Sequence, residues 1–167
     1  MSVLASPLCN VLSYQRAMRG LAIAYQHVDS ALISAHIHCP AELMVYYPRL
    51  PFILADLSAM GLLQPDMQVA NIPVPSSRAE YLGMRYVIEG AQLGSRVIER
   101  NLSQSDIASQ LTNARQFWSS GLAWQRGWPL LLSQLSTLQN RTELAQTVRA
   151  ARSTFQHFIA SLSTVAE

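Results

Sequence analysis

Residues 81–100 read YLGMRYVIEGAQLGSRVIER and form the most strongly patterned stretch of the chain. Wound at 100° per residue, the stretch places polar side chains on one arc and apolar side chains opposite, which predicts one amphipathic helix. The polar arc contains Arg78, Arg85, Glu89, Gln92, Arg96, Glu99 and Arg100. The apolar arc contains Leu82, Tyr86, Val87, Leu93, Val97 and Ile98.

Three glycines lie in the middle of the apolar face. Gly83, Gly90 and Gly94 project within roughly 40° of one another at helical geometry. Because a glycine inside a helix costs about 1 kcal/mol relative to alanine, the row predicts that something approaches the backbone closely. Two occupants remain open: a second helix that crosses here, or a flat ligand that lies on the bare backbone.

Helical spacing also organises the rest of the chain. Residues 13–35 form a predicted helix with the apolar stripe Tyr14, Met18, Leu21, Tyr25, Val28 and Leu32. The predicted last helix, which Asn140 and Glu143 open, carries Leu144, Val148, Ala151, Phe155, Phe158, Ile159 and Leu162. Gly61 is expected to end a helix, Ser77 and Glu80 to begin the glycine helix as a capping box, and Pro129 to open another helix.

No strand pattern of useful length is present, and residues 41–47 are expected to add a short helix. The sequence therefore predicts an all-α fold, a single-domain multi-helix bundle over residues 1–167 with residues 1–12 as a loose lead-in. At 167 residues the chain is long enough for a substantial core.

Composition excludes several classes of protein. Half of the residues are hydrophobic, 13% are charged and the net charge is +2, which argues against disorder and against nucleic-acid binding. No apolar run approaches the ~20 residues of a membrane span, and the N-terminus lacks a signal-peptide pattern. Cys9 and Cys39 are isolated and are expected to be free thiols in the cytoplasm.

Motifs for catalysis are absent from the sequence. It contains no P-loop, no dinucleotide-binding glycine motif after a strand and no nucleophile elbow. His36, His38 and Cys39 lie close together but lack a distant matching pair, so a loop with incidental histidines is favoured over a metal site. If chemistry occurs here, a bound cofactor should supply it.

Residues 86–98, YVIEGAQLGSRVI, resemble the distal-helix motif of bacterial heme oxygenases, the biliverdin-forming branch that includes phytochrome-associated members. The pattern of that motif is approximately Y-V-x-E-G-S-x-L-G-G-x-x-I. Residues 49–61, RLPFILADLSAMG, are similar to the family's R-L…L-x-x-D-L-x-x-L-G, and residues 117–128 to its F-x-x-x-G…G-x-x-W region. The resemblance covers roughly residues 13–163 and implies an all-α fold.

In that family haem lies between a proximal and a distal helix, and the distal glycines let the backbone approach the porphyrin and the iron-bound O₂. The resemblance implies that Gly90 and Gly94 face the iron, with Tyr86, Ala91 and Ser95 beside them in the motif. It also makes Arg126 a candidate partner for a haem propionate, with a solvated loop arginine as the alternative.

The sequence departs from the family pattern in three places. Ala91 replaces a serine, and Ser95 replaces the second glycine of a pair. The family's axial histidine lies on a helix that precedes the segment matched by residues 13–35, whereas residues 1–12 contain no histidine. The chain is therefore expected to be a truncated or degenerate member without the proximal helix, and His27 becomes the candidate axial ligand.

Two functions follow from the resemblance. The first is a heme oxygenase that opens haem to biliverdin, iron and CO with O₂ and electrons from an external donor. The second is a non-catalytic homologue that binds another flat tetrapyrrole, such as a bilin, or a protein partner. Loss of a helix would also expose apolar surface on its former neighbours, which predicts a homodimer or a refilled cleft. No nucleic-acid or membrane partner is expected.

Overall fold

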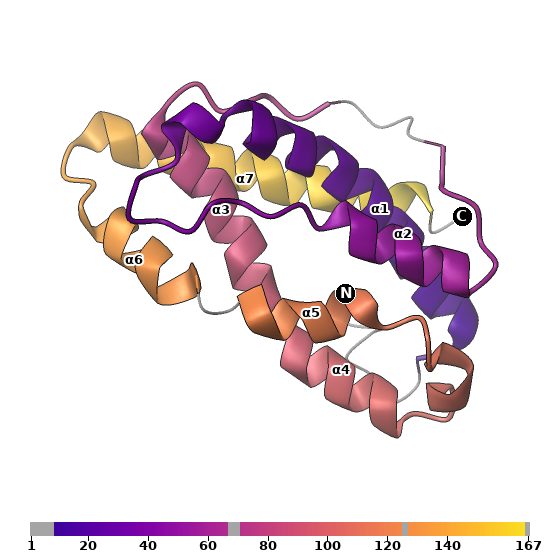
Figure 1. The fold of residues 1–167 in the computed structure, drawn as a ribbon. Helices are drawn as coiled ribbons and strands as arrows, with labels where there is room; N and C mark the ends of the chain where they lie inside the picture. The colour runs from indigo at the N-terminus through magenta and orange to yellow at the C-terminus, as the bar shows by residue number, and fades with distance from the viewer. Residues whose placement is uncertain (1–8, 67–70, 125–126, 166–167) are drawn as a thin grey trace.

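The computed structural model describes residues 9–66, 71–124 and 127–165, and across these ranges the regular structure is entirely helical (Figure 1). The α-helices are α1 (Val11–Ser34), α2 (Leu50–Ala59), α3 (Arg78–Gln92), α4 (Ser95–Gln104), α5 (Gln116–Trp124), α6 (Trp128–Ser136) and α7 (Arg141–Thr164). Short 3₁₀ turns cover His36–His38 and Ala108–Leu111. The predicted all-α class is confirmed.

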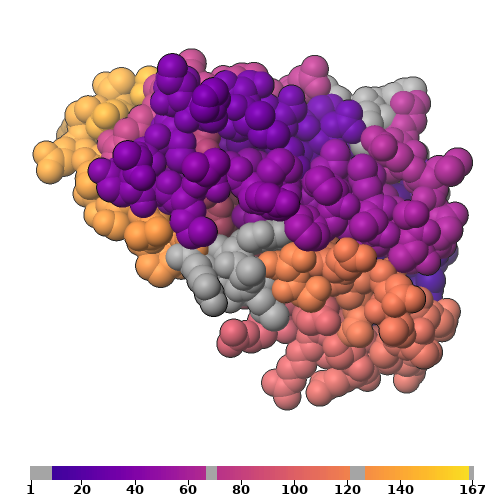
Figure 2. Space-filling view, viewed as in Figure 1, coloured from indigo at the N-terminus to yellow at the C-terminus, as the bar shows by residue number. Residues whose placement is uncertain are grey.

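Three long helices form the body of the molecule. Helix α7 packs along α3 and α1, and α1 also contacts α2. The shorter α4 and α5 lie against each other at one end, and α2 joins them to the body through α5 (Figure 1). In the space-filling view of the same face, the magenta surface of the α2 region borders the orange surface of α5 (Figure 2).

Local sequence signals fix several helix ends. Ser77 and Asn140 accept hydrogen bonds from the backbone N–H groups of Glu80 and Glu143, as the capping patterns predict. The Glu80 carboxylate binds the Ser76 N–H, one residue before the position that a capping box requires. Gly61 has φ of 69° and ends α2, because a residue with a Cβ rarely adopts that conformation.

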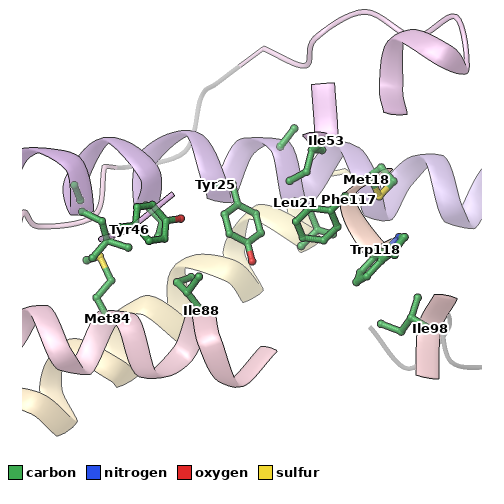
Figure 3. Close-up of a cluster of buried hydrophobic side chains, with 14 of the residues drawn as sticks. Met18, Leu21, Tyr25, Tyr46, Ile53, Met84, Ile88, Ile98, Phe117 and Trp118 are labelled. Carbon is green, nitrogen blue, oxygen red and sulfur yellow. The ribbon is translucent and has the colours of Figure 1, made fainter. Parts of the chain in front are cut away.

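The core lies between α1, α3 and α5, and Figure 3 shows its central side chains. All six members of the predicted α1 stripe are buried. Helix α1 begins at Val11, two residues earlier than expected, because the Asn10 side chain caps it by accepting from the Ser13 N–H. Tyr25 packs edge-on against Phe117, with 5.5 Å between ring centroids, and so joins α1 to α5.

The single helix predicted over residues 81–100 is wrong. Helix α3 ends at Gln92 and α4 begins at Ser95, with Leu93 and Gly94 between them. The Gly94 N–H turns to the carbonyl of Ala91 at 3.3 Å, three residues back, so the α-helical hydrogen-bond ladder is interrupted at the glycine. The short helix predicted over 41–47 is also wrong, because those residues form a turn, a bend and irregular backbone.

The assignment of solvent and core faces to this stretch is also partly wrong. Arg85, Glu89 and Gln92 are at most 2% exposed, whereas Tyr86 is 40% exposed. The same inversion occurs in α7, where Leu144, Val148, Phe155 and Ile159 are exposed, and Thr154, His157 and Ser161 are buried. In α7 the residues that face inward are small or polar because the helix crosses α3 closely. In α3 the charged residues Arg85 and Glu89 are buried because they pair with each other.

Two buried aspartates each connect one helix to the start of another. Asp29 of α1 accepts hydrogen bonds from the N–H groups of Arg49 and Leu50 at the start of α2, each at 2.8 Å. Asp56 of α2 accepts those of Gln116 and Phe117 at the start of α5, at 2.8 and 2.9 Å. Each carboxylate satisfies donors that a helix N-terminus leaves open, so α1, α2 and α5 are tied in sequence.

Replacing Asp56 by asparagine should alter the pH dependence of stability. Burial raises the pKa of Asp56 from 3.8 to about 6. The folded chain therefore takes up a proton that the unfolded chain does not, so this carboxyl group stabilises the fold most below about pH 4 and loses that effect as pH rises through 6. In urea unfolding, the free energy of unfolding of wild type minus that of Asp56→Asn should be larger at pH 5 than at pH 7.5.

The matched control is Asp106→Asn, because Asp106 is exposed. Its difference from wild type measures what an exposed carboxylate contributes to the pH dependence. A difference for Asp56→Asn that changes no more than this between pH 5 and pH 7.5 would contradict the raised pKa.

Candidate functional site

The three glycines of the α3 region face different neighbours. A Cβ on Gly83 would overlap the backbone carbonyl of Thr147 and lie 3.1 Å from the Ala150 Cβ, so Gly83 is required for the crossing of α3 and α7. A Cβ on Gly90 would meet the ring of Trp128 at 3.4 Å. Around Gly94 there is open space apart from the Ala91 carbonyl oxygen at 3.5 Å. A helix crossing therefore explains Gly83 and leaves the other two glycines for other roles.

A flat group does cover Gly90, and it is a side chain of this chain. The indole of Trp128, from the start of α6, lies beside Gly90 and stacks at a tilt on Tyr86, with 5.4 Å between ring centroids. Trp128 ends the segment 117–128, which resembles the family's F-x-x-x-G…G-x-x-W region. The two motifs therefore meet in space at Gly90.

An apolar cavity of about 180 Å³ lies beside the face of α3 that carries Val87 and Ala91, next to the face that carries Gly90. It lies where α1, α3, α5 and α7 meet. Its walls are Leu21, Tyr25, Val87, Ala91, Gln92, Phe117, Trp118, Phe155, Phe158, Ile159 and Leu162. Phe155 and Ile159 are 51% and 63% exposed, so the cavity is continuous with an apolar surface of α7.

The polar groups of this cavity form one chain of hydrogen bonds. Gln92 donates through Nε2 to the Tyr25 hydroxyl at 3.2 Å, and its Oε1 accepts from Ser95 Oγ at 2.9 Å. Burial raises the pKa of Tyr25 far above its ordinary value, so the phenol stays protonated. The cavity therefore presents neutral polar groups at one wall and hydrocarbon elsewhere.

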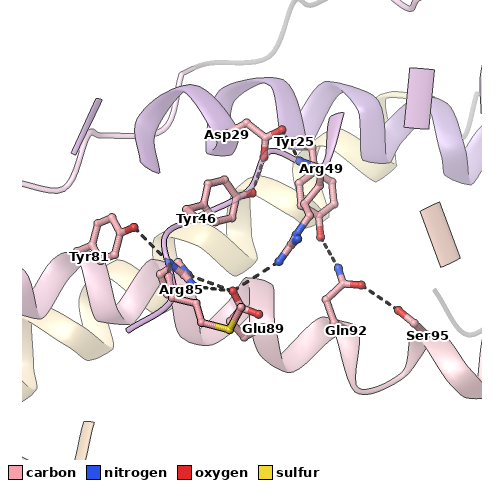
Figure 4. A network of polar contacts seen from close by, with 10 residues as sticks. Tyr25, Asp29, Tyr46, Arg49, Tyr81, Arg85, Glu89, Gln92 and Ser95 are labelled. Carbon is pink, nitrogen blue, oxygen red and sulfur yellow. Dashed lines mark hydrogen bonds and ion pairs between the residues drawn. The ribbon is translucent and has the colours of Figure 1, made fainter. Parts of the chain in front are cut away.

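A second buried network lies nearer the start of α3 and is ionic (Figure 4). Glu89 Oε1 lies 2.9 Å from Arg85 Nη2 and 3.6 Å from Arg49 Nη2. Arg85 also donates to the Tyr81 hydroxyl at 3.2 Å and to the Met44 carbonyl at 3.1 Å. The Tyr46 hydroxyl donates to the carboxylate of Asp29. Burial raises the pKa of Asp29, and the hydrogen bonds that its carboxylate accepts offset only part of that rise.

Buried polar contacts give a structural role to several motif residues. Arg49 and Asp56 from the segment at 49–61, and Glu89 from the distal-type motif, are all buried in contacts that hold helices together. Sequence reasoning placed Glu89 on a solvent face and missed these contacts. The spacing of Arg85 and Glu89, four residues apart, is the signal that could have indicated a paired charge.

The predicted site residues are distributed over several environments. Ala91 lines the apolar cavity, Tyr86 and Gly90 contact Trp128, and Ser95 ends the hydrogen-bond chain from Tyr25. Gly94 forms the break between α3 and α4. Arg126, the propionate candidate, lies outside the described residues.

His27 lies apart from the cavity beside α3. It follows Tyr25 by two positions on α1, which is about 200° around the helix. Its Nδ1 is 3.3 Å from Nε2 of His157 on α7, and its ring lines a different cavity with Gln26, Ser30, Asn71 and Ile72. Across the described residues, no three His, Cys, Asp or Glu side chains gather closely enough to hold a metal ion.

The apolar cavity fits part of a flat ring better than it fits a ligated iron. Its volume of about 180 Å³ is below the ~300 Å³ at which small-molecule sites usually begin, so a tetrapyrrole would extend onto the exposed side chains of α7. Among the described residues that line it, none is a His, Cys or Met that could serve as an axial ligand. Tyr25 is present, but its hydroxyl is protonated and engaged by Gln92.

The described fold and cavity define an all-helical protein with an apolar pocket beside a glycine-containing helix. The chain is 35% identical over 114 residues to a protein named heme oxygenase from Xanthomonas campestris pv. campestris (strain 8004). The match covers 68% of this chain and 66% of that relative, just under two thirds of its length. The chain is therefore similar to a heme oxygenase over about two thirds of its own length.

Other comparisons give no further relatives. No family model matches the chain, and no solved structure matches it. Within the described part of the chain, none of the helices is long and apolar enough to cross a membrane.

Proposed function

We propose that this chain is a heme oxygenase-like protein that binds a flat tetrapyrrole in the apolar cavity between α1, α3, α5 and α7. The observation that carries the proposal is the position of Ala91. It lies within the stretch that resembles a distal-helix motif, and it lines an open apolar cavity. Aromatic walls at Phe117, Trp118 and Phe155 suit the faces and edges of a conjugated ring.

The first candidate activity is the one that the relative's name indicates: conversion of haem to biliverdin, iron and CO with O₂ and an external electron donor. The chain's contribution to this activity would be to bind the macrocycle and exclude water from one face. The Tyr25–Gln92–Ser95 chain would provide neutral hydrogen-bonding groups at the cavity wall. The described lining of the cavity holds no His, Cys or Met that would ligate the iron.

The second candidate is a non-catalytic homologue that binds a bilin or another metal-free tetrapyrrole. The makeup of the cavity lining favours it, because an apolar wall with a phenol and an amide suits an open-chain tetrapyrrole without any metal ligand. On this account the family fold has been kept and the redox chemistry has been lost, as in a degenerate member of the biliverdin-producing branch.

Turnover separates the two candidates. Purified protein is incubated with hemin, a reductant and O₂, and biliverdin and CO are measured against free hemin. Biliverdin formed above the free-hemin rate supports the first candidate. Saturable 1:1 binding of biliverdin without turnover supports the second. The His27→Ala variant should bind and react as wild type does, because His27 contacts His157 and lies off the cavity.

A homodimer is part of the same proposal. Leu144 and Val148 of α7 are 45% and 55% exposed, and Phe155 and Ile159 continue the same apolar stripe. A second copy would cover Leu144 and Val148 and leave Phe155 and Ile159 to the ligand, which predicts a concentration-dependent mass in sedimentation experiments. A constant monomer mass would contradict the dimer. We also propose a cytoplasmic location, which the two free cysteines support.

A further inference from the structure

A pair of histidines joins α1 to α7 on the side of α1 away from the apolar cavity. His27 Nδ1 and His157 Nε2 are 3.3 Å apart, the ring centroids are 5.1 Å apart and the ring planes are inclined by 58°. His157 is buried and His27 is half-buried. The pair serves no purpose in the tetrapyrrole proposal, so its geometry invites a separate explanation.

The two separations fit a shared metal ion. Imidazole nitrogens at 2.0–2.1 Å from a tetrahedral Zn²⁺ are about 3.3–3.4 Å apart, and their ring centres are then about 5.2 Å apart. A linear N–H···N hydrogen bond of the observed length would hold the ring centres about 5.6 Å apart. The observed 5.1 Å shows that the two ring nitrogens do not point straight at each other.

The surroundings of His157 prepare it as a ligand. Its ring also hydrogen-bonds to the backbone of Ala24, a contact that raises its pKa and therefore favours the ring as the donor. Nε2 faces His27, so we assign the Ala24 bond to Nδ1–H, the tautomer that leaves the lone pair of Nε2 toward His27. A histidine fixed in this way by a backbone carbonyl is the usual arrangement around a protein-bound metal ion.

Solvent can reach the pair from the His27 side. A cavity of about 470 Å³ has His27 in its wall together with the polar side chains of Gln26, Ser30 and Asn71. Water entering from this cavity would complete the coordination of an ion held by two imidazoles. Burial lowers the pKa of both histidines, and in His157 the neighbouring ring adds to the effect, so both rings are neutral near pH 7, as ligands must be.

We propose that His27 and His157 form a two-histidine binding site for a divalent transition metal ion of the Zn²⁺, Ni²⁺ or Cu²⁺ class, which links α1 to α7. Imidazole suits these ions better than Mg²⁺ or Ca²⁺, which prefer oxygen ligands. The hydrogen-bonding proton on His27 Nδ1 moves to its Nε2 when the ion binds. No net proton is then released, and the charge of the ion is added to the site.

Zn²⁺ titration of the purified chain tests the proposal. Binding is followed by calorimetry and by the ring ¹⁵N signals of the four histidines, His27, His36, His38 and His157. The signals of His27 and His157 should shift together at one equivalent of Zn²⁺. His27→Gln and His157→Gln should each weaken binding by at least about tenfold, which the loss of one of two ligands implies.

The control is the double variant His36→Gln/His38→Gln, which removes the other two histidines and should bind Zn²⁺ with wild-type affinity. If Zn²⁺ shifts only the His36 and His38 signals, or none of the four, the pair is a structural hydrogen bond and the proposal is wrong. The ring signals are read in the wild-type protein, so the result does not depend on the folding of a variant. Tetrapyrrole binding is a separate measurement, and its failure would leave this one unaffected.

Discussion

Gly83→Ala should destabilise the protein by at least about 2 kcal/mol, although alanine is the better helix former. The new Cβ would overlap the Thr147 carbonyl and crowd Ala150, and both lie on the opposing helix α7. Backbone atoms cannot turn aside as a flexible side chain can, so α3 and α7 would have to move apart. The free energy of unfolding in urea measures the effect.

Gly90→Ala is the matched control on the same helix. Its Cβ would lie 3.4 Å from the Trp128 ring, which is close to ordinary contact. The gain in helix propensity of about 1 kcal/mol should offset this contact, so the variant should be about as stable as wild type. Equal losses for the two variants would contradict the assignment of Gly83 to a helix crossing and Gly90 to another role.

Glu89→Gln should destabilise the protein by about 3–5 kcal/mol, the usual result of removing one partner of a buried ion pair. Glu89 is 2% exposed, and its Oε1 forms ion pairs with the guanidinium groups of both Arg85 and Arg49. Glutamine keeps the size of the side chain but removes the negative charge, so two buried cations lose their shared carboxylate. Chemical unfolding at neutral pH gives the value.

Glu99→Gln provides the comparison. Glu99 pairs with Arg115 at 3.4 Å, but both side chains are more than 20% exposed, so the loss should be about 1 kcal/mol or less. If the loss for Glu89→Gln is no larger than this, the stability of the fold does not depend on the buried charges of Arg49, Arg85 and Glu89. If Glu89→Gln loses little stability while Gly83→Ala still loses much, the α3–α7 crossing stabilises the fold and the buried ion pair does not.

The features that local sequence determines were predictable. Ser77, Asn140 and Gly61 end or begin helices through groups within a few residues of themselves, and the structure confirms all three. The stripe of α1 was also predictable, since its apolar residues face the core in the ordinary way.

Residues that are buried by distant partners were not predictable in this way. Helical periodicity assigned Arg85 and Glu89 to solvent, because it cannot register that Arg49, which caps the start of α2, pairs with Glu89. It assigned Phe155 and Ile159 to the core, whereas Gly83 and Gly20 bring α7 so close to α3 and α1 that its small residues face inward. A Cβ on Gly20 would lie 2.9 Å from the Leu162 Cα.

The candidate site shows the same division. The motif directed attention to the stretch that includes Ala91, and the structure places Ala91 at an apolar cavity. The other walls of that cavity come from α1, α5 and α7, and the sequence contained no signal that they converge. The indole of Trp128 over Gly90 was likewise not foreseen, since contacts between separate helices are not encoded in local spacing.

The most direct test of the account is a titration of hemin and of biliverdin into wild type, Ala91→Trp and Ala59→Trp, followed by absorbance. Ala91 is exposed at the cavity, where tryptophan should fill the space, and Ala59 is exposed at the end of α2 as a control. The account predicts saturable 1:1 binding of at least one of the two tetrapyrroles to wild type and Ala59→Trp, weakened at least about tenfold in Ala91→Trp. Binding that is unchanged in Ala91→Trp, or spectra no different from those of the free ligands, would contradict it.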